Sequence, residues 1–187
     1  MIYIALLILL LFIVGWLYYN RPQPMLDKNK IARQFRDVFL KFNEICKEAH
    51  VNFFICGGTL LGHIREKKFI DHDVNINIGM FHDTGDQLLA ALQQAGFTKI
   101  IDYPENSPGG FTIAYNGVPI NVQYFKPGTI KDQICWWSPT AKRTLCIQNF
   151  DLAESHFLGL EINIPNPPDE YLAQVFGKDW RSPKKKY

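Results

Sequence analysis

The chain has 187 residues, of which 47% are hydrophobic, 20% charged and 14% aromatic, and its formal net charge is +2. This is the composition of a globular protein, so it excludes an intrinsically disordered chain and a low-complexity fibre. The small net charge predicts no extended basic face, so we expect no nucleic-acid partner.

The first segment, residues 2–19, carries no charged side chain and is long enough to cross a hydrocarbon core of about 30 Å as a helix. Trp16, Tyr18 and Tyr19 lie at its C-terminal end, where an interfacial aromatic belt would be found. Its sequence has neither the basic n-region nor the small-residue cleavage site of a signal peptide. We therefore expect an uncleaved single-pass anchor in the lipid bilayer, with a cleavable signal peptide and a buried helix as the alternatives.

A short polar linker with two prolines follows at residues 20–27, and it leads into a domain at residues 28–187 that is long enough for one hydrophobic core rather than two. The positive-inside rule favours a cytoplasmic domain, because basic residues follow the apolar segment and none precedes it. These basic residues are Arg21, Lys28, Lys30, Arg33 and Arg36.

Helical and strand patterns alternate through the domain. Predicted helices occupy residues 28–49, 60–65, 86–95 and 166–176, and predicted strands occupy residues 51–56, 74–78, 97–101, 111–115 and 118–125. Residues 147–164 are predicted as strand and turn, and the Asn116–Gly117 pair predicts a hairpin. The alternation predicts an α+β or α/β class with one mixed sheet.

The four cysteines form no CxxC pair, and their spacing matches no zinc site. Cys46 lies on a predicted helix and Cys56 in an apolar run, so both are expected to be buried free thiols. For Cys135 and Cys146 the sequence allows two states: a disulfide in an oxidising compartment, or two reduced thiols.

A glycine-rich turn follows the first predicted strand, at Gly57, Gly58 and Thr59. Such a turn lets backbone amides approach an anion closely, which makes these residues candidates for nucleotide or phosphate binding. Arg65 and Lys68 come next and are candidate partners for a diphosphate. The alternatives are a plain tight turn and a solvated loop.

The strand predicted at residues 74–78 is expected to place the side chains of Asp73, Asn75 and Asn77 on one face. A neighbouring strand would bring Asn121 beside them. Polar side chains next to a glycine turn suit a magnesium-dependent nucleotidyl-transfer site, where carboxylates hold the metal that neutralises phosphate oxygens. The alternative is a solvated row of amides on an exposed strand.

Trp136 and Trp137 either form a stacking surface for a base or sugar, or pack within the core and at its rim. Trp180 is expected to cover the last helix.

Two separated motifs resemble the LicD/fukutin family. The first begins with Gly-Gly-Thr-Leu-Leu-Gly at residues 57–62, continues through Phe69–Ile70 and ends at residues 78–80; the second occupies residues 171–183. The resemblance spans roughly residues 35–183 and implies an α+β, nucleotidyltransferase-like fold with a mixed sheet flanked by helices. It further implies transfer of a phospho-alcohol, of phosphocholine or ribitol-phosphate type, from a CDP-activated donor to a glycan. Anchoring in the Golgi or another endomembrane by one N-terminal helix is also implied.

The chain departs from the family pattern at its acidic positions. Carried over residue by residue, the family's catalytic positions are Asp73, Asn75, Asn77 and Asn121, the first three being metal ligands, and only Asp73 is a carboxylate. Attraction between unit charges 4 Å apart is worth about 4 kcal/mol at an effective dielectric of about 20. We therefore expect weak or absent binding of Mg²⁺ or Mn²⁺. Two functions remain open: a transferase of weakened activity, and a catalytically impaired nucleotide-binding or scaffold subunit in a hetero-oligomer with an active homologue.

Overall fold

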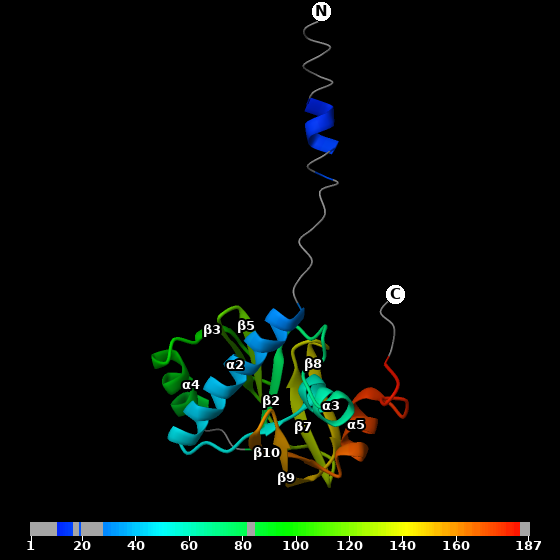
Figure 1. Ribbon diagram of the computed structural model, residues 1–187. Coiled ribbons are helices and arrows are strands. Elements are labelled where there is room, and N and C mark those ends of the chain that lie inside the picture. Colours follow the sequence, from blue (N-terminus) through cyan, green and yellow to red (C-terminus); the bar gives the residue numbers. More distant parts are fainter. Residues whose placement is uncertain (1–10, 17–18, 20–27, 82–84, 184–187) are drawn as a thin grey trace, which may run out of the picture. The chain divides into compact units, whose positions relative to one another are not determined.

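The computed structural model describes residues 11–16, 19, 28–81 and 85–183 (Figure 1). The chain divides into two compact units, residues 1–31 and residues 32–187. In the first unit, residues 11–16 are helical. Within the described part of the chain, none of the helices combines the length and the apolar character of a membrane span. The structure does not describe residues 2–10, 17 and 18 of the predicted anchor. The whole predicted linker at residues 20–27 also lies outside the described residues.

The rest of the structure is a mixed α+β fold (Figure 1). Its helices are α2 (Lys28–Glu48), α3 (Gly57–Glu66), α4 (Gly85–Gln94) and α5 (Pro168–Phe176). Its strands are β1 (Phe54–Ile55), β2 (Ile76–Met80), β3 (Thr98–Asp102), β4 (Gly110–Tyr115), β5 (Val118–Tyr124), β6 (Lys126–Pro127), β7 (Gln133–Ser138), β8 (Arg143–Gln148), β9 (Asp151–Phe157) and β10 (Leu160–Asn166). The Asn116–Gly117 hairpin is confirmed, since both residues have positive φ angles between the antiparallel strands β4 and β5.

The strands form two sheets, so the prediction of one mixed sheet was incomplete. The larger sheet has seven strands in the order β3-β4-β5-β2-β1-β10-β9, and the smaller has three in the order β6-β7-β8. The larger sheet is mixed, because β2 pairs with β5 and β1 pairs with β10 in parallel while the other pairs are antiparallel. Hydrophobic alternation identifies a strand, but it does not specify the neighbour with which that strand exchanges hydrogen bonds.

Near the glycine turn, two observed strands differ from the predicted ones: the first is shorter, and the second begins later in the sequence. Of residues 51–56 only Phe54 and Ile55 form a strand, because Cys56 already occupies the N-cap of α3. The glycine pair therefore begins helix α3 instead of separating a strand from a shorter helix. The strand predicted at residues 74–78 begins two residues later, at Ile76, because residues 71–72 form a turn and Asn75 lies in a bend.

Aromatic side chains pack α2 against the loops and strands that surround α3. Phe39 contacts Phe53, Phe69 and Phe157 edge to face, with ring centroids 5.8–6.2 Å apart. Edge-to-face packing of this kind adds to the hydrophobic stabilisation from burial, which is about 1.5–3 kcal/mol for each phenylalanine. The cluster fixes the framework on which the glycine turn is built.

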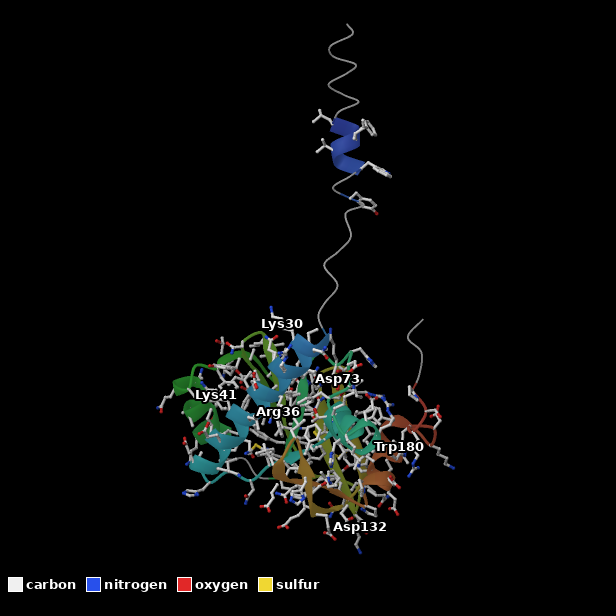
Figure 2. All side chains as sticks on the ribbon, in the orientation of Figure 1. Lys30, Arg36, Lys41, Asp73, Asp132 and Trp180 are labelled. Atoms are coloured by element: carbon white, nitrogen blue, oxygen red, sulfur yellow. A yellow bond between two sulfur atoms is a disulfide. The ribbon has the colours of Figure 1, made fainter. Side chains whose placement is uncertain are left out.

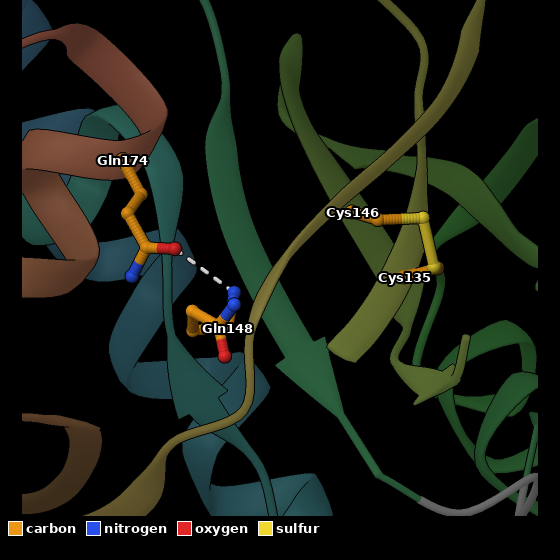
Figure 3. The surroundings of a disulfide bond; sticks show 4 residues. All are labelled: Cys135, Cys146, Gln148 and Gln174. Atoms are coloured by element: carbon orange, nitrogen blue, oxygen red, sulfur yellow. Dashed lines mark hydrogen bonds between the residues drawn. A yellow bond between two sulfur atoms is a disulfide. The ribbon is translucent and has the colours of Figure 1, made fainter. Parts of the chain in front are cut away.

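A disulfide joins Cys135 of β7 to Cys146 of β8, which face each other directly in the smaller sheet (Figure 3). Next to it, the backbone N–H of Gln148 donates a hydrogen bond of 2.9 Å to Oε1 of Gln174, which connects β8 with α5. Cys46 and Cys56 are buried free thiols, as predicted.

The cysteine pairing predicts the number of reactive thiols. We expect a maleimide probe to label two thiols per chain in denaturant without a reductant, and four after reduction, because Cys135 and Cys146 are paired. In the native state Cys46 is expected to react slowly, since burial raises its pKa to about 12 and keeps it protonated. Intact mass after labelling measures the count, and four labelled thiols without reductant would contradict the pairing.

Candidate functional site

The site is built around the first turn of α3. Cys56 is extended at the N-cap and Gly57 has a positive φ of 51°, so the chain reverses sharply from β1 into the helix. A Cβ atom at position 58 would lie 3.2 Å from Oδ2 of Asp73, so Gly58 allows the carboxylate to approach the backbone closely. The N-terminal end of a helix carries partial positive charge and exposed amides, which suits an anionic group.

A row of polar side chains crosses three neighbouring strands beside this turn. Thr112 of β4 faces Asn121 of β5, and Asn121 faces Asn77 of β2. Oγ1 of Thr112 donates to Oδ1 of Asn121 at 2.9 Å, and Nδ2 of Asn121 donates to Oδ1 of Asn77 at 3.4 Å. The backbone N–H of Asn77 donates to Oγ1 of Thr59 at 2.8 Å, which ties the row to α3.

Asp73 reaches the site by a route other than the predicted strand face. The backbone N–H of Asp73 donates to the carbonyl of Ile70 at 3.0 Å, and this turn carries the carboxylate to Gly58. Asn75 lies half-buried in the bend that precedes β2. The alternation of side chains holds only within an extended strand, so it does not extend back to Asp73 and Asn75.

A pocket of about 320 Å³ opens beside the turn, between α3 and the segment after α5. Figure 2 labels Asp73 and Trp180, which both line it. Arg65 lines the pocket as well, and its Nη2 is 2.6 Å from Oε1 of Glu66. Lys68 forms an ion pair with Asp71 at the surface and is not among the lining residues. Of the two predicted diphosphate partners, the structure therefore brings only Arg65 to the pocket.

Tyr171 of α5 connects the C-terminal helix to the glycine turn. The backbone N–H of Gly57 donates to the hydroxyl of Tyr171 at 3.4 Å. Cys56, at the same turn, donates from Sγ to Oε1 of Gln123 at 3.3 Å. Burial raises the pKa of both Cys56 and Tyr171, so both groups stay protonated and uncharged at neutral pH. Two motifs far apart in the sequence thus converge on one turn.

Of the two roles considered for Trp136, the structure confirms packing within the core. The ring of Trp136 is buried and stacks on Phe125 with centroids 5.0 Å apart, which places it within the packing of the smaller sheet. Phe176 and Trp180 line the pocket instead. The sequence predicts Trp180 only as a cover for the last helix, although the place of this residue in the second motif is a signal for the site.

The residues at the site are a poor fit for a divalent metal. Among the described residues, no group of three or more His, Cys, Asp or Glu side chains is arranged to hold a metal ion. Asn121 directs an amide N–H at the amide oxygen of Asn77, so this pair is satisfied without a cation. Two carboxylates in the same places would repel each other and favour a cation between them.

Comparisons with known proteins identify similar families and folds. The model of the LicD/FKTN/FKRP nucleotidyltransferase domain matches residues 50–167, which is more than half of the chain. Similar curated proteins bear the name ribitol-5-phosphate transferase FKTN: the Mus musculus protein is 26% identical over 151 residues, and the Homo sapiens protein is 27% identical over 147 residues. These matches cover 74% and 72% of this chain but 31% and 30% of the relatives, so the chain spans about a third of their length.

Two solved structures share the fold. ANT(2")-Ia, in complex with adenylyl-2"-tobramycin, has a TM-score of 0.51 and covers 73% of this chain and 70% of its own. The lincosamide antibiotic adenylyltransferase LnuA, lincomycin-bound, has a TM-score of 0.52 and covers 76% and 93%. Both are 11% identical to this chain, so they support the nucleotidyltransferase-like fold alone.

The contact between Tyr171 and Gly57 predicts a stability effect. Tyr171→Phe removes the acceptor of the half-buried Gly57 amide, so we expect the free energy of unfolding to fall by about 0.5–1.5 kcal/mol. Tyr115→Phe is the matched control, because it removes a hydrogen bond from Lys41 at a less buried position. Chemical denaturation measures both, and an equal or smaller loss for Tyr171→Phe would contradict the role of its hydroxyl.

Proposed function

The chain belongs to the LicD/FKTN/FKRP nucleotidyltransferase family, and from this membership we propose that it acts in glycan modification by phospho-alcohol transfer. The proposed donor is CDP-activated, the transferred group is of ribitol-phosphate or phosphocholine type, and the acceptor is a glycan. The names of the curated relatives support the ribitol-phosphate type. The activity is proposed to be weak, because the side chains of Asn77 and Asn121 bring no negative charge to a metal ion.

The first turn of α3 is the proposed seat of the donor's phosphates. The helix end supplies partial positive charge. Asp73 lies at the edge of this turn, where its carboxylate is placed to accept a proton or a hydrogen bond from an acceptor hydroxyl. Catalysis in such a site would come from positioning and electrostatics.

A second candidate function is that of a nucleotide-binding or scaffold subunit beside an active homologue. The hydrogen bond from Asn121 to Asn77 favours it, because the position that two acids would share holds a self-satisfied amide pair. Compared with a site that has two acids at these positions, this site has the same shape and less negative charge. Such a protein would keep the donor pocket and lose metal-dependent transfer.

The proposed location is an endomembrane compartment such as the Golgi, with residues 2–19 as a single-pass anchor. The Cys135–Cys146 disulfide supports the oxidising side of the membrane, because cytosolic thiols are kept reduced. This disagrees with the cytoplasmic side predicted from the basic residues after the apolar segment. We give the disulfide more weight, because it reflects the environment of the folded domain itself.

The amide pair predicts how metal affinity responds to restored acids. In the Asn77→Asp/Asn121→Asp double variant, two carboxylates would face each other across β2 and β5. We expect Mg²⁺ and Mn²⁺ to bind at least about tenfold more tightly than in the wild type, because each added charge attracts the cation. Isothermal titration calorimetry measures the affinity. A rise in the melting temperature on adding metal reports that the cation relieves the repulsion between the two introduced carboxylates.

Asn75→Asp is the matched control, because it adds the same charge in the bend before β2, outside the pair. It is expected to change metal affinity less than the double variant. A gain of phospho-alcohol transfer in the double variant would support a weakened transferase, and a gain of metal affinity without transfer would support the scaffold. Micromolar metal binding by the wild type would contradict the weak-metal interpretation.

A further inference from the structure

We propose that the pocket between α3 and the segment after α5 binds an uncharged ring, and that charged phosphates are held outside it. The ring is either the nucleobase of a donor or a sugar of an acceptor; both have an apolar face and a hydrogen-bonding edge. We name this cavity the ring pocket, lined on its apolar side by Leu61, Ile70, Phe176, Trp180 and Pro183. The proposal deepens the proposed function and rests on it for the identity of the ring.

The aromatic wall of the ring pocket is rigid where Trp180 forms it. Trp180 is only 4% exposed, and the Arg181 guanidinium lies 4.4 Å from its ring centroid. Arg181 in turn forms an ion pair with Asp169 of α5. Phe176 is half-buried and provides the more accessible part of the wall. A preformed wall binds a flat face with little loss of conformational entropy.

The ring pocket has a guanidinium that is already paired, that of Arg65, and a carboxylate, that of Asp73. Arg65 donates to Oε1 of Glu66 from both Nε, at 3.1 Å, and Nη2, at 2.6 Å, so its charge is already compensated. Asp73 adds a carboxylate to the lining. A diphosphate would meet this carboxylate without an uncompensated guanidinium, which disfavours it electrostatically. Hydroxyl or amino groups on a ring, by contrast, find both donors and acceptors.

Size and position agree with a single ring. A volume of about 320 Å³ is at the lower end of small-molecule pockets, which hold about 300–1,000 Å³. That leaves room for one ring, with the rest of a nucleotide-activated donor extending beyond the pocket. Gly58 belongs both to the lining and to the first turn of α3. A phosphate attached to a ring in the pocket would therefore emerge beside the first turn of α3.

The test uses the full chain with three probes: cytidine for the donor base, methyl β-galactoside for an acceptor sugar, and inorganic pyrophosphate for the charged part. We expect the wild type to bind cytidine or the glycoside in titrations followed by NMR. Phe176→Ala is expected to weaken that binding about tenfold, as removal of a stacking partner does, and to leave pyrophosphate affinity unchanged. Phe176→Tyr keeps the ring and should retain the affinity.

Trp137→Ala is the control for loss of an aromatic side chain outside the ring pocket, and it should leave all three affinities unchanged. Cytidine binding assigns the pocket to the donor, and glycoside binding assigns it to the acceptor. The proposal is overturned if neither ring binds at millimolar concentration, or if Phe176→Ala weakens only pyrophosphate.

A transfer assay separates this proposal from the proposed function. Loss of ring binding in Phe176→Ala without transfer by the wild type would support the ring pocket and contradict transferase activity. Transfer by the wild type, with an unchanged KM in Phe176→Ala, would support the activity and overturn the ring pocket.

Discussion

The parallel pairing of β2 with β5 is the constraint on which the site depends. Its register sets Asn77 opposite Asn121, and the hydrogen bond from the Asn77 backbone to Thr59 holds α3 against the same strand. A slip of β5 by one residue would turn Asn121 to the other face of the sheet and away from Asn77. Because apolar residues of β2 and β5 are buried, such a shift would also expose core side chains, so the register is strongly specified.

The asparagine pair joins β2 to β5 through uncharged side chains. Asparagine and aspartate have nearly the same size, but an amide offers a donor as well as an acceptor. Nδ2 of Asn121 contributes that donor to the oxygen of Asn77, so the pair stabilises itself. In a metal site the cation performs this role, which is why replacing acids by amides weakens the need for the metal without disturbing the strands.

The C-terminal helix contributes to the site from the far end of the domain sequence. Tyr171 accepts a hydrogen bond from Gly57, while Phe176 and Trp180 close the pocket beside Gly58. The disulfide between β7 and β8, and the contact from Gln148 to Gln174, brace the sheet against which this helix lies. The glycine turn and the closing motif therefore form one structural unit, although 114 positions separate Gly57 from Tyr171.

The sequence by itself determined the elements and residue types of the site: an amphipathic α2, the Asn116–Gly117 hairpin, the glycine turn, and a single carboxylate among four polar positions. These features follow from local periodicity, turn chemistry and charge, which a linear sequence contains. The tertiary structure alone decided that Asp73 arrives through a turn, that Trp136 packs against Phe125, and that Phe176 and Trp180 line the pocket. It also decided that β6, β7 and β8 form a separate sheet. Such outcomes depend on which distant segments pack together, and packing between segments is set by the whole core rather than by local pattern.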